Sequence, residues 1–169
     1  MSTSVSVNTY TYSVTFVADN VQRTLKDIIV QSGLDPTKYV NSWKCINLAL
    51  TTWMQSKHLK TIILEIFNPK DDTLVGRWDV EITYGWSSSD TGSFWIDTDQ
   101  IKTAIRKCGA VPSSCEYQIM FQNSPGHAEV DGWSDGKFRS TDGFVKQSLG
   151  NTVEHCGLGA NASYYRKKA

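Results

Sequence analysis

The sequence predicts an α+β fold, in which helices pack on a mostly antiparallel sheet. Strand-like and helix-like periods follow one another between residues 9 and 122 in the order β-α-α-β-β-α-β. Two of these strands are joined directly by the short turn at 68–72, which makes them an antiparallel hairpin. The remaining part, after residue 123, has no sustained period, so the regular core is expected to end there.

Four segments are predicted to be strands. Residues 9–16 (TYTYSVTF) alternate large side chains with Thr and Ser, and residues 61–67 are almost continuously apolar, as in a well-buried strand. Residues 74–85 alternate again, with charged side chains on one face, which is expected to be in contact with water. Residues 116–122 (EYQIMFQ) are predicted to be the last regular strand.

Three helices are predicted between these strands. The first begins at a capping residue, Asp19, and ends at Gly33. The second begins at the Asp-Pro pair 35–36 and keeps one broad apolar face as far as Met54. The third is capped by Asp97 or Thr98, ends at Gly109, and carries an apolar stripe formed by Ile101, Ala104, Ile105 and Cys108.

The part of the chain from Asn123 onward, residues 123–159, is predicted to be an irregular, glycine-hinged segment. Residues 123–159 contain seven of the twelve glycines. Their scattered aromatic and aliphatic side chains are too many for a solvated linker. Long segments without secondary structure are uncommon in compact domains unless they serve a function. This segment is therefore expected to wrap over the domain and to dock by its aromatic residues.

Composition excludes several classes of protein. Seventeen basic and seventeen acidic residues cancel, so there is no net charge to attract nucleic acid or an acidic membrane. The N-terminus lacks the basic and apolar parts of a signal peptide, which predicts a cytoplasmic protein. The four cysteines are then expected to be free thiols, and their spacing predicts no metal site. The sequence also contains no phosphate-binding loop.

Two chemical alternatives rest on single features. His155 and Cys156 are a nucleophilic pair only if their side chains meet, and neighbours on an extended chain point to opposite faces. A small hydrolase that uses Cys156 and a distant histidine therefore stays an alternative. Trp86, Trp95 and Trp133 lie in or beside predicted loops and are candidates for the stacking surface of a carbohydrate-binding module.

Three extended stretches, residues 11–36, 63–109 and 132–159, carry a family resemblance. They begin TYSVTFVADNVQR, ILEIFNPKDDTLVGRW and GWSDGKFRSTDGF. Together they resemble the bacterial HORMA-domain proteins, and more narrowly the single-HORMA type of the anti-phage operons called CBASS. The resemblance covers essentially the whole chain and is carried by these stretches rather than by a short motif.

The resemblance implies a HORMA-like α+β fold with a C-terminal mobile "safety belt". In this family the belt closes around a closure-motif peptide, which adds a strand to the sheet. The closed form binds and activates a cGAS-like nucleotidyltransferase, and an AAA+ ATPase takes it apart by engaging the N-terminus. The resemblance thus implies a peptide-binding switch in antiviral signalling that is not an enzyme and needs no cofactor.

The implied site can be placed on this chain. An added strand needs an open sheet edge, for which the strand 116–122 is the candidate. The chain is expected to be one domain, with a flexible N-terminus (1–8), a core (9–122) and the belt (123–169). The peptide-binding candidates are Tyr117, Gln118, Ile119, Met120 and Phe121 on the edge, with Trp133, Phe138, Phe144, Val145 and Val153 in the belt. The hinge candidates are Gly126, Gly132, Gly136, Gly143 and Gly150, and the ATPase is expected to engage Ser2, Thr3, Ser4 and Val5.

Overall fold

The computed structural model describes residues 9–87, 95–96, 99–108 and 111–168. Within these ranges the chain forms four helices and six strands. The helices are α1 (Tyr10–Gln31), α2 (Thr37–Asn41), α3 (Trp43–Gln55) and α4 (Asp99–Cys108). The strands are β1 (Leu59–Phe67), β2 (Leu74–Tyr84), β3 (Trp95–Ile96), β4 (Glu116–Asn123), β5 (Phe144–His155) and β6 (Leu158–Lys167). None of the helices described is long and apolar enough to cross a lipid bilayer.

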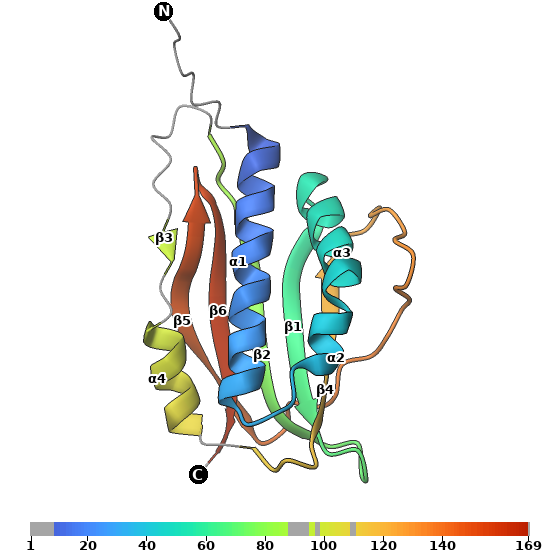
Figure 1. Cartoon of the computed structure of the whole chain (residues 1–169), viewed down its shortest axis with the longest axis vertical. Helices are drawn as coiled ribbons and strands as arrows, with labels where there is room; N and C mark the ends of the chain where they lie inside the picture. Colours follow the sequence, from blue (N-terminus) through green and yellow to red (C-terminus); the bar gives the residue numbers. More distant parts are fainter. Residues whose placement is uncertain (1–8, 88–94, 97–98, 109–110, 169) are drawn as a thin grey trace, which may run out of the picture.

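The six strands form one antiparallel sheet in the order β3-β5-β6-β2-β1-β4. All of the described helices lie on one face of this sheet (Figure 1). The long helix α1 runs over the middle strands, and α2 and α3 lie toward β1 and β4. The fold is therefore α+β with helices on a mostly antiparallel sheet, as the sequence predicts.

The core lies between α1, α3 and the sheet. Side chains of α1 at helical spacing, such as Val17, Leu25 and Ile28, are fully buried. They pack with Leu50 and Met54 of α3 and with the inner faces of β1, β2 and β6 in one cluster. Burying an aliphatic side chain of this size stabilises the fold by about 1.5–3 kcal/mol. The helical layer is thus firmly fixed to the sheet, while the opposite sheet face has no helix on it in the described ranges.

The prediction of a strand at 9–16 is wrong, because these residues form the first turns of α1. Thr9 caps the helix, and its hydroxyl accepts a hydrogen bond from the Tyr12 N–H at 3.1 Å. Ser13, Val14 and Val17 are buried at helical spacing, so tertiary packing decides between two periods that a short stretch satisfies equally. Asp19 is consequently not a cap. The helix does end where predicted, since Gly33 follows it with a φ of 88°.

The prediction of an irregular segment from 123 to 159 is also wrong from residue 144 onward, because residues 144–167 are regular. These residues form the long hairpin of β5 and β6, which pairs with β2. Register irregularities near Gly150 and Val153 hide the period-two alternation of β5. The two turn residues, Cys156 and Gly157, both have positive φ (54° and 89°), as a type I′ hairpin turn requires.

Three smaller differences concern β2 and the second and third predicted helices. Asp79 lies on the face of β2 predicted to be wet, but it is 4% exposed and pairs with Arg77 at 2.7 Å. In α4, the predicted stripe is buried except for Cys108, which is exposed. The predicted cap at 97–98, the end at Gly109 and most of the loop 86–93 lie outside the described residues. The second predicted helix is divided at Ser42 into α2 and α3.

Candidate functional site

Strand β4 is an edge strand with one side free. It is last in the strand order and pairs only with β1. The Ser124 N–H donates to the His58 carbonyl at 2.7 Å, which places even-numbered residues of β4 in hydrogen bonds with β1. The backbone groups of Tyr117, Ile119 and Phe121 therefore face away from the sheet. Within the described residues, no other backbone group bonds to this side of β4.

The segment that follows β4, residues 124–143, begins on the helix side of this edge. We call it the crossing segment. The Trp53 indole N–H donates to the Ala128 carbonyl at 2.7 Å, which ties the segment to α3. Trp133 packs on Phe121 with ring centroids 4.6 Å apart, and its indole N–H donates to the Cys45 carbonyl at 3.2 Å. The first half of the crossing segment is thus held between α3 and β4.

The second half lies on the opposite face of the sheet. A Cβ atom added at Gly136 would lie 3.3 Å from the Met120 methyl group, so the backbone passes close to that side chain. Met120 points to the face opposite Phe121, because successive side chains of a strand alternate. The segment therefore passes around the free edge of β4 between Trp133 and Gly136. It encloses that edge on its way to β5 (Figure 1).

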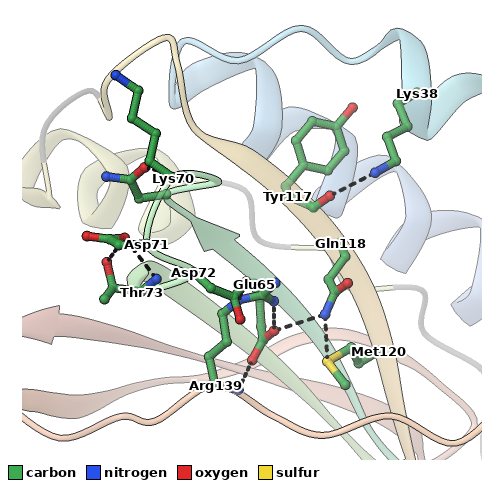
Figure 2. Close-up of polar contacts among 11 residues, drawn as sticks. Lys38, Glu65, Lys70, Asp71, Asp72, Thr73, Tyr117, Gln118, Met120 and Arg139 are labelled. Atoms are coloured by element: carbon green, nitrogen blue, oxygen red, sulfur yellow. Dashed lines mark hydrogen bonds and ion pairs between the residues drawn. The ribbon is translucent and has the colours of Figure 1, made fainter.

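A buried ion pair fastens the far end of the crossing segment to the sheet. The Arg139 Nη1 donates to Glu65 Oε1 at 2.7 Å, and the Arg139 backbone N–H donates to Glu65 Oε2 at 2.8 Å. Gln118 Nε2 donates to Glu65 Oε1 at 3.2 Å, so the edge strand contributes to the same cluster. Figure 2 shows these side chains converging from β1, β4 and the crossing segment. We call the cluster of Glu65, Arg139 and Asp72 the latch.

The latch is built so that each charge has partners. Glu65 has no exposed surface, and Arg139 lies with its guanidinium 3.5 Å from the centre of the Phe67 ring. Arg139 also reaches Asp72 Oδ1 at 2.7 Å in the β1–β2 turn. Burial lowers the pKa of Arg139, but the bonds with Asp72 and Glu65 outweigh it, and the pKa is raised. Removing Arg139 would leave the buried Glu65 carboxylate uncompensated, which costs about 3–5 kcal/mol in proteins.

A hollow of about 450 Å³ lies beside the latch, on the face away from the helices. It is lined by residues of the β1–β2 turn, of β4, of the crossing segment and of the start of β5. Its lining is polar, charged and aromatic, and it includes Gln118, Lys137, Phe138 and Phe144. The hollow adjoins the N-terminal half of the free edge through Gln118.

The structure brings most of the predicted belt and edge residues together. Trp133 contacts the edge strand, and Phe138 and Phe144 share the hollow with Gln118. Val145 and Val153 lie instead in β5, which is separated from β4 by three strands. Positive φ is found at Gly126, Gly132, Gly143 and Gly150 of the hinge candidates, but not at Gly136. Residues 2–5 lie outside the described residues.

Sequence reasoning missed the residues of the latch. A signal for one was present, since Glu65 is the single charge in the apolar run TIILEIF. A charge in such a run needs a partner when the strand is buried. Arg139 and Asp72 carried no comparable signal, because they lie in a segment and a turn where charged residues are ordinary.

His155 and Cys156 do approach each other, contrary to the expectation from an extended chain. The left-handed conformation of Cys156 brings its Sγ to 3.8 Å from His155 Nε2. Both are buried, with exposures of 0% and 1%, and His155 Nδ1 lies 2.6 Å from the Ser13 hydroxyl. A nucleophile without access to solvent cannot meet a substrate in this state. The pair joins the hairpin tip to α1.

The described tryptophans that are candidates for a sugar-stacking surface have packing contacts instead. Trp86 is half-buried and its indole N–H donates to Ser13 Oγ at 3.0 Å, and Trp133 is packed on Phe121. Both are thus engaged in contacts within the domain, and the Trp95 side chain lies outside the described residues. In the described ranges, no group of three or more His, Cys, Asp or Glu side chains is arranged to hold a metal ion.

Comparison with known proteins gives a family match and a set of similar folds. The model of the family described as Bacterial HORMA domain 2 matches residues 2–168. No curated protein is similar enough in sequence to match. A chain in the crystal structure of the Mitotic Checkpoint Complex is similar at a TM-score of 0.75 and 13% identity, over 92% of this chain and 99% of that one.

Two further structures are informative because each contains a similar fold together with a binding partner. One is C. elegans HTP-2 bound to the HIM-3 closure motif, with a TM-score of 0.65 and 13% identity over 92% of this chain and 90% of that one. The other is the CdnC:HORMA-deltaN complex of E. coli MS115-1, with a TM-score of 0.67 and 9% identity over 99% and 94%. At these identities the likeness concerns the fold.

Proposed function

This chain belongs to the bacterial HORMA domain 2 family, and from this premise we propose that it is a peptide-binding conformational switch. A closure-motif peptide would add to the sheet as a strand along the free side of β4. The crossing segment, followed by the β5–β6 hairpin, would act as the belt that holds it. We infer that the chain works as one domain and that it catalyses no reaction.

The observation that carries this proposal is the enclosed free edge of β4. Unpaired N–H and C=O groups of an edge strand give affinity for an extended peptide, and side-chain contacts give selectivity. Here the crossing segment passes from one face of β4 to the other and is fastened on both sides. Similarity to the fold of HTP-2, which occurs with a bound closure motif, supports the binding of such a peptide.

An enclosed peptide would leave slowly. Its release requires the crossing segment to open, and opening breaks the Trp133 contacts or the buried latch. Because association requires the same opening, loading would also be slow. This is the physical reason for an ATP-driven remodeller, and we propose that an AAA+ ATPase disassembles the closed form through residues 2–5.

The partner of the closed form would be a cGAS-like nucleotidyltransferase. The similar fold in the CdnC:HORMA-deltaN complex of E. coli MS115-1 supports this proposal. We propose that the peptide-bound chain binds and activates such an enzyme in the cytoplasm, as part of CBASS anti-phage signalling. Neither direct binding of nucleic acid nor attachment to a membrane is needed for this role.

Cutting the crossing segment tests the belt. A site-specific protease sequence is inserted between Ser134 and Asp135, which are both exposed. A tightly bound peptide, selected on the full chain, is loaded with a fluorescent label, and its dissociation is followed before and after cleavage. We expect dissociation to accelerate strongly after the cut, while the uncut protein serves as the control. Equal dissociation rates in the two states would refute an enclosing belt.

Signalling is tested with the nucleotidyltransferase of the same genome. We expect the peptide-loaded chain to raise the yield of nucleotide product, and the peptide-free chain to raise it less. Addition of the AAA+ ATPase and ATP should reverse the effect, and deletion of residues 2–5 should prevent this reversal. A nucleotidyltransferase that makes as much product alone as with the loaded chain would rule out activation.

A further inference from the structure

We propose that the closure peptide carries two consecutive acidic residues, which are recognised by Lys38 and Lys137 at the N-terminal end of β4. This inference rests on the proposed function, since it assumes a strand added to β4. It assigns the ligand a chemical class: an extended peptide with a carboxylate pair at one end and apolar residues beside it.

Lys38 is fixed on the helix side of the free edge. Its ammonium group donates to the Tyr117 carbonyl at 3.4 Å, and that carbonyl faces away from β1 (Figure 2). The helix that carries Lys38 is pinned to β4, because the Tyr117 hydroxyl donates to the Asp35 carbonyl at 2.7 Å and accepts from the Tyr39 N–H at 3.2 Å. An added strand would bond to the Tyr117 carbonyl and free the ammonium group for another partner.

Lys137 lies on the opposite face at the same end of the strand. It lines the hollow of about 450 Å³ together with Gln118. The nearby Arg139 is already committed to Glu65 and Asp72, so it is not available to a ligand. Within the described part of the chain, neither Lys38 nor Lys137 forms an ion pair.

The carboxylates of the protein near these lysines do not neutralise them in the structure. Asp35 accepts from the N–H and hydroxyl of Thr37. Asp142 lines the same hollow as Lys137, but the two form no ion pair among the described residues. Glu116 begins β4 and is exposed. Among the described residues, the two ammonium groups therefore flank the path of an added strand without a partner of opposite charge.

The geometry of a β-strand predicts which residues the bound peptide should carry at these positions. Consecutive side chains of an added strand point to opposite faces of the sheet. Two neighbouring residues near Tyr117 and Gln118 would thus meet Lys38 on one face and Lys137 on the other. Farther along, the edge presents Ile119, Met120 and Phe121, with Trp133 beside them, so the adjoining peptide residues would be apolar.

The experiment uses a displayed library of random nine-residue peptides, selected on the full chain with long incubation to allow the crossing segment to open. Three proteins are compared: the natural chain, the double variant Lys38→Glu with Lys137→Glu, and the control Lys26→Glu. Lys26 is an exposed lysine of α1 without an ion pair among the described residues. Thermal melts confirm that all three are folded, and the single variants are tested alongside.

We expect the natural chain and the control to select peptides with Asp or Glu at two consecutive positions at a fixed distance from the apolar ones. The double variant should select Lys or Arg at those positions. For an acidic peptide, each single reversal should raise Kd about threefold to fivefold at low salt, as loss of a surface ion pair does. High salt should reduce the difference.

Two outcomes separate the failure of this inference from the failure of the proposed function. If all pools share apolar positions but show the same acidic content, the peptide binds and the lysines do not select it. This result overturns the inference alone. If no peptide is enriched on any protein, the proposed function fails, and the inference fails with it.

Discussion

Arg139 and Glu65, 74 positions apart in the chain, form a buried ion pair with a distance of 2.7 Å between Nη1 and Oε1. The pair joins the crossing segment to β1 on the sheet face that carries no helix in the described ranges (Figure 2). The closed arrangement of the chain is therefore held at a defined point. Removing this ion pair is expected to lower the stability of the fold and to let the crossing segment open before the sheet does.

The variant Arg139→Ala tests the latch directly. It leaves the carboxylate of Glu65 without its cation, so we expect the free energy of unfolding to fall by up to about 3–5 kcal/mol, and by less if water reaches Glu65. Hydrogen exchange should rise first in residues 128–142, while β1 and β2 stay protected. The matched control is Arg23→Ala, which removes an exposed pair with Asp19 and should cost less than about 1 kcal/mol. Equal effects of the two variants would contradict a latch.

The two carboxylates of the latch should contribute unequally. Glu65 is buried, whereas 73% of the Asp72 side chain is exposed. In double-mutant cycles with Arg139→Gln, we expect a coupling energy of about 2–3 kcal/mol with Glu65→Gln. The coupling with Asp72→Asn should be below about 1 kcal/mol, because solvent screens that pair. Denaturant unfolding of the six proteins gives both coupling energies. A larger coupling with Asp72 than with Glu65 would mean that the ion pair in the β1–β2 turn holds the crossing segment.

Gly157 is expected to be the least replaceable glycine among those described. It has a φ of 89°, and a Cβ atom there would collide with the backbone carbonyl of Gly85. Gly157→Ala should lower the free energy of unfolding by more than about 3 kcal/mol and loosen the β5–β6 hairpin. Gly143→Ala is the control, since its φ is 82° and nothing lies within 4 Å of its Cβ position. That variant should cost only about 1–2 kcal/mol of backbone strain. Circular dichroism melts distinguish the two.

Thiol labelling should report opening of the hairpin tip. Cys108 is exposed, although partial burial raises the pKa of its thiol, while Cys156 is 1% exposed. We expect iodoacetamide to label Cys108 of the native chain well before Cys156, followed by mass spectrometry of peptides. Labelling of Cys156 should become fast only in denaturant. Rapid native labelling of Cys156 would instead favour the hydrolase alternative.

High pH should destabilise the chain through its buried tyrosines. Burial raises the pKa of Tyr10 from 10.0 to about 12, and its hydroxyl donates to the Met54 carbonyl at 2.6 Å. The proton is held more tightly in the folded state, so this contribution is present below pH 10 and is lost as pH rises from 10 to 12. Tyr10→Phe should reduce the loss over this interval and cost about 1 kcal/mol at pH 7. Denaturant titrations at several pH values test this, and an unchanged alkaline profile would exclude Tyr10 as a contributor.

Local patterns predict the elements whose period is long and unambiguous. The hairpin of β1 and β2, the stripe of α4, the end of α1 at Gly33 and the strand β4 all follow from spacing and turn residues in the sequence. They do so because each is specified by neighbours along the chain. The HORMA-like form of the fold follows from the family resemblance of the extended stretches and not from these local patterns.

Other features depend on contacts between distant residues. Residues 10–16 fit both a strand and a helix, and burial of Ser13, Val14 and Val17 against the core selects the helix. The alternation of β5 is interrupted by irregularities that only pairing with β6 makes tolerable. In each case the local preference is weak, so the energy of packing or of strand pairing determines the structure.

The candidate site divides in the same way. That EYQIMFQ is a strand follows from its own residues, but that it is an edge strand depends on the order of all six strands. The latch depends on a crossing segment that brings Arg139 to Glu65 across 74 positions. Sequence periodicity contains no information on such contacts, because it describes which side of an element is buried and not what buries it.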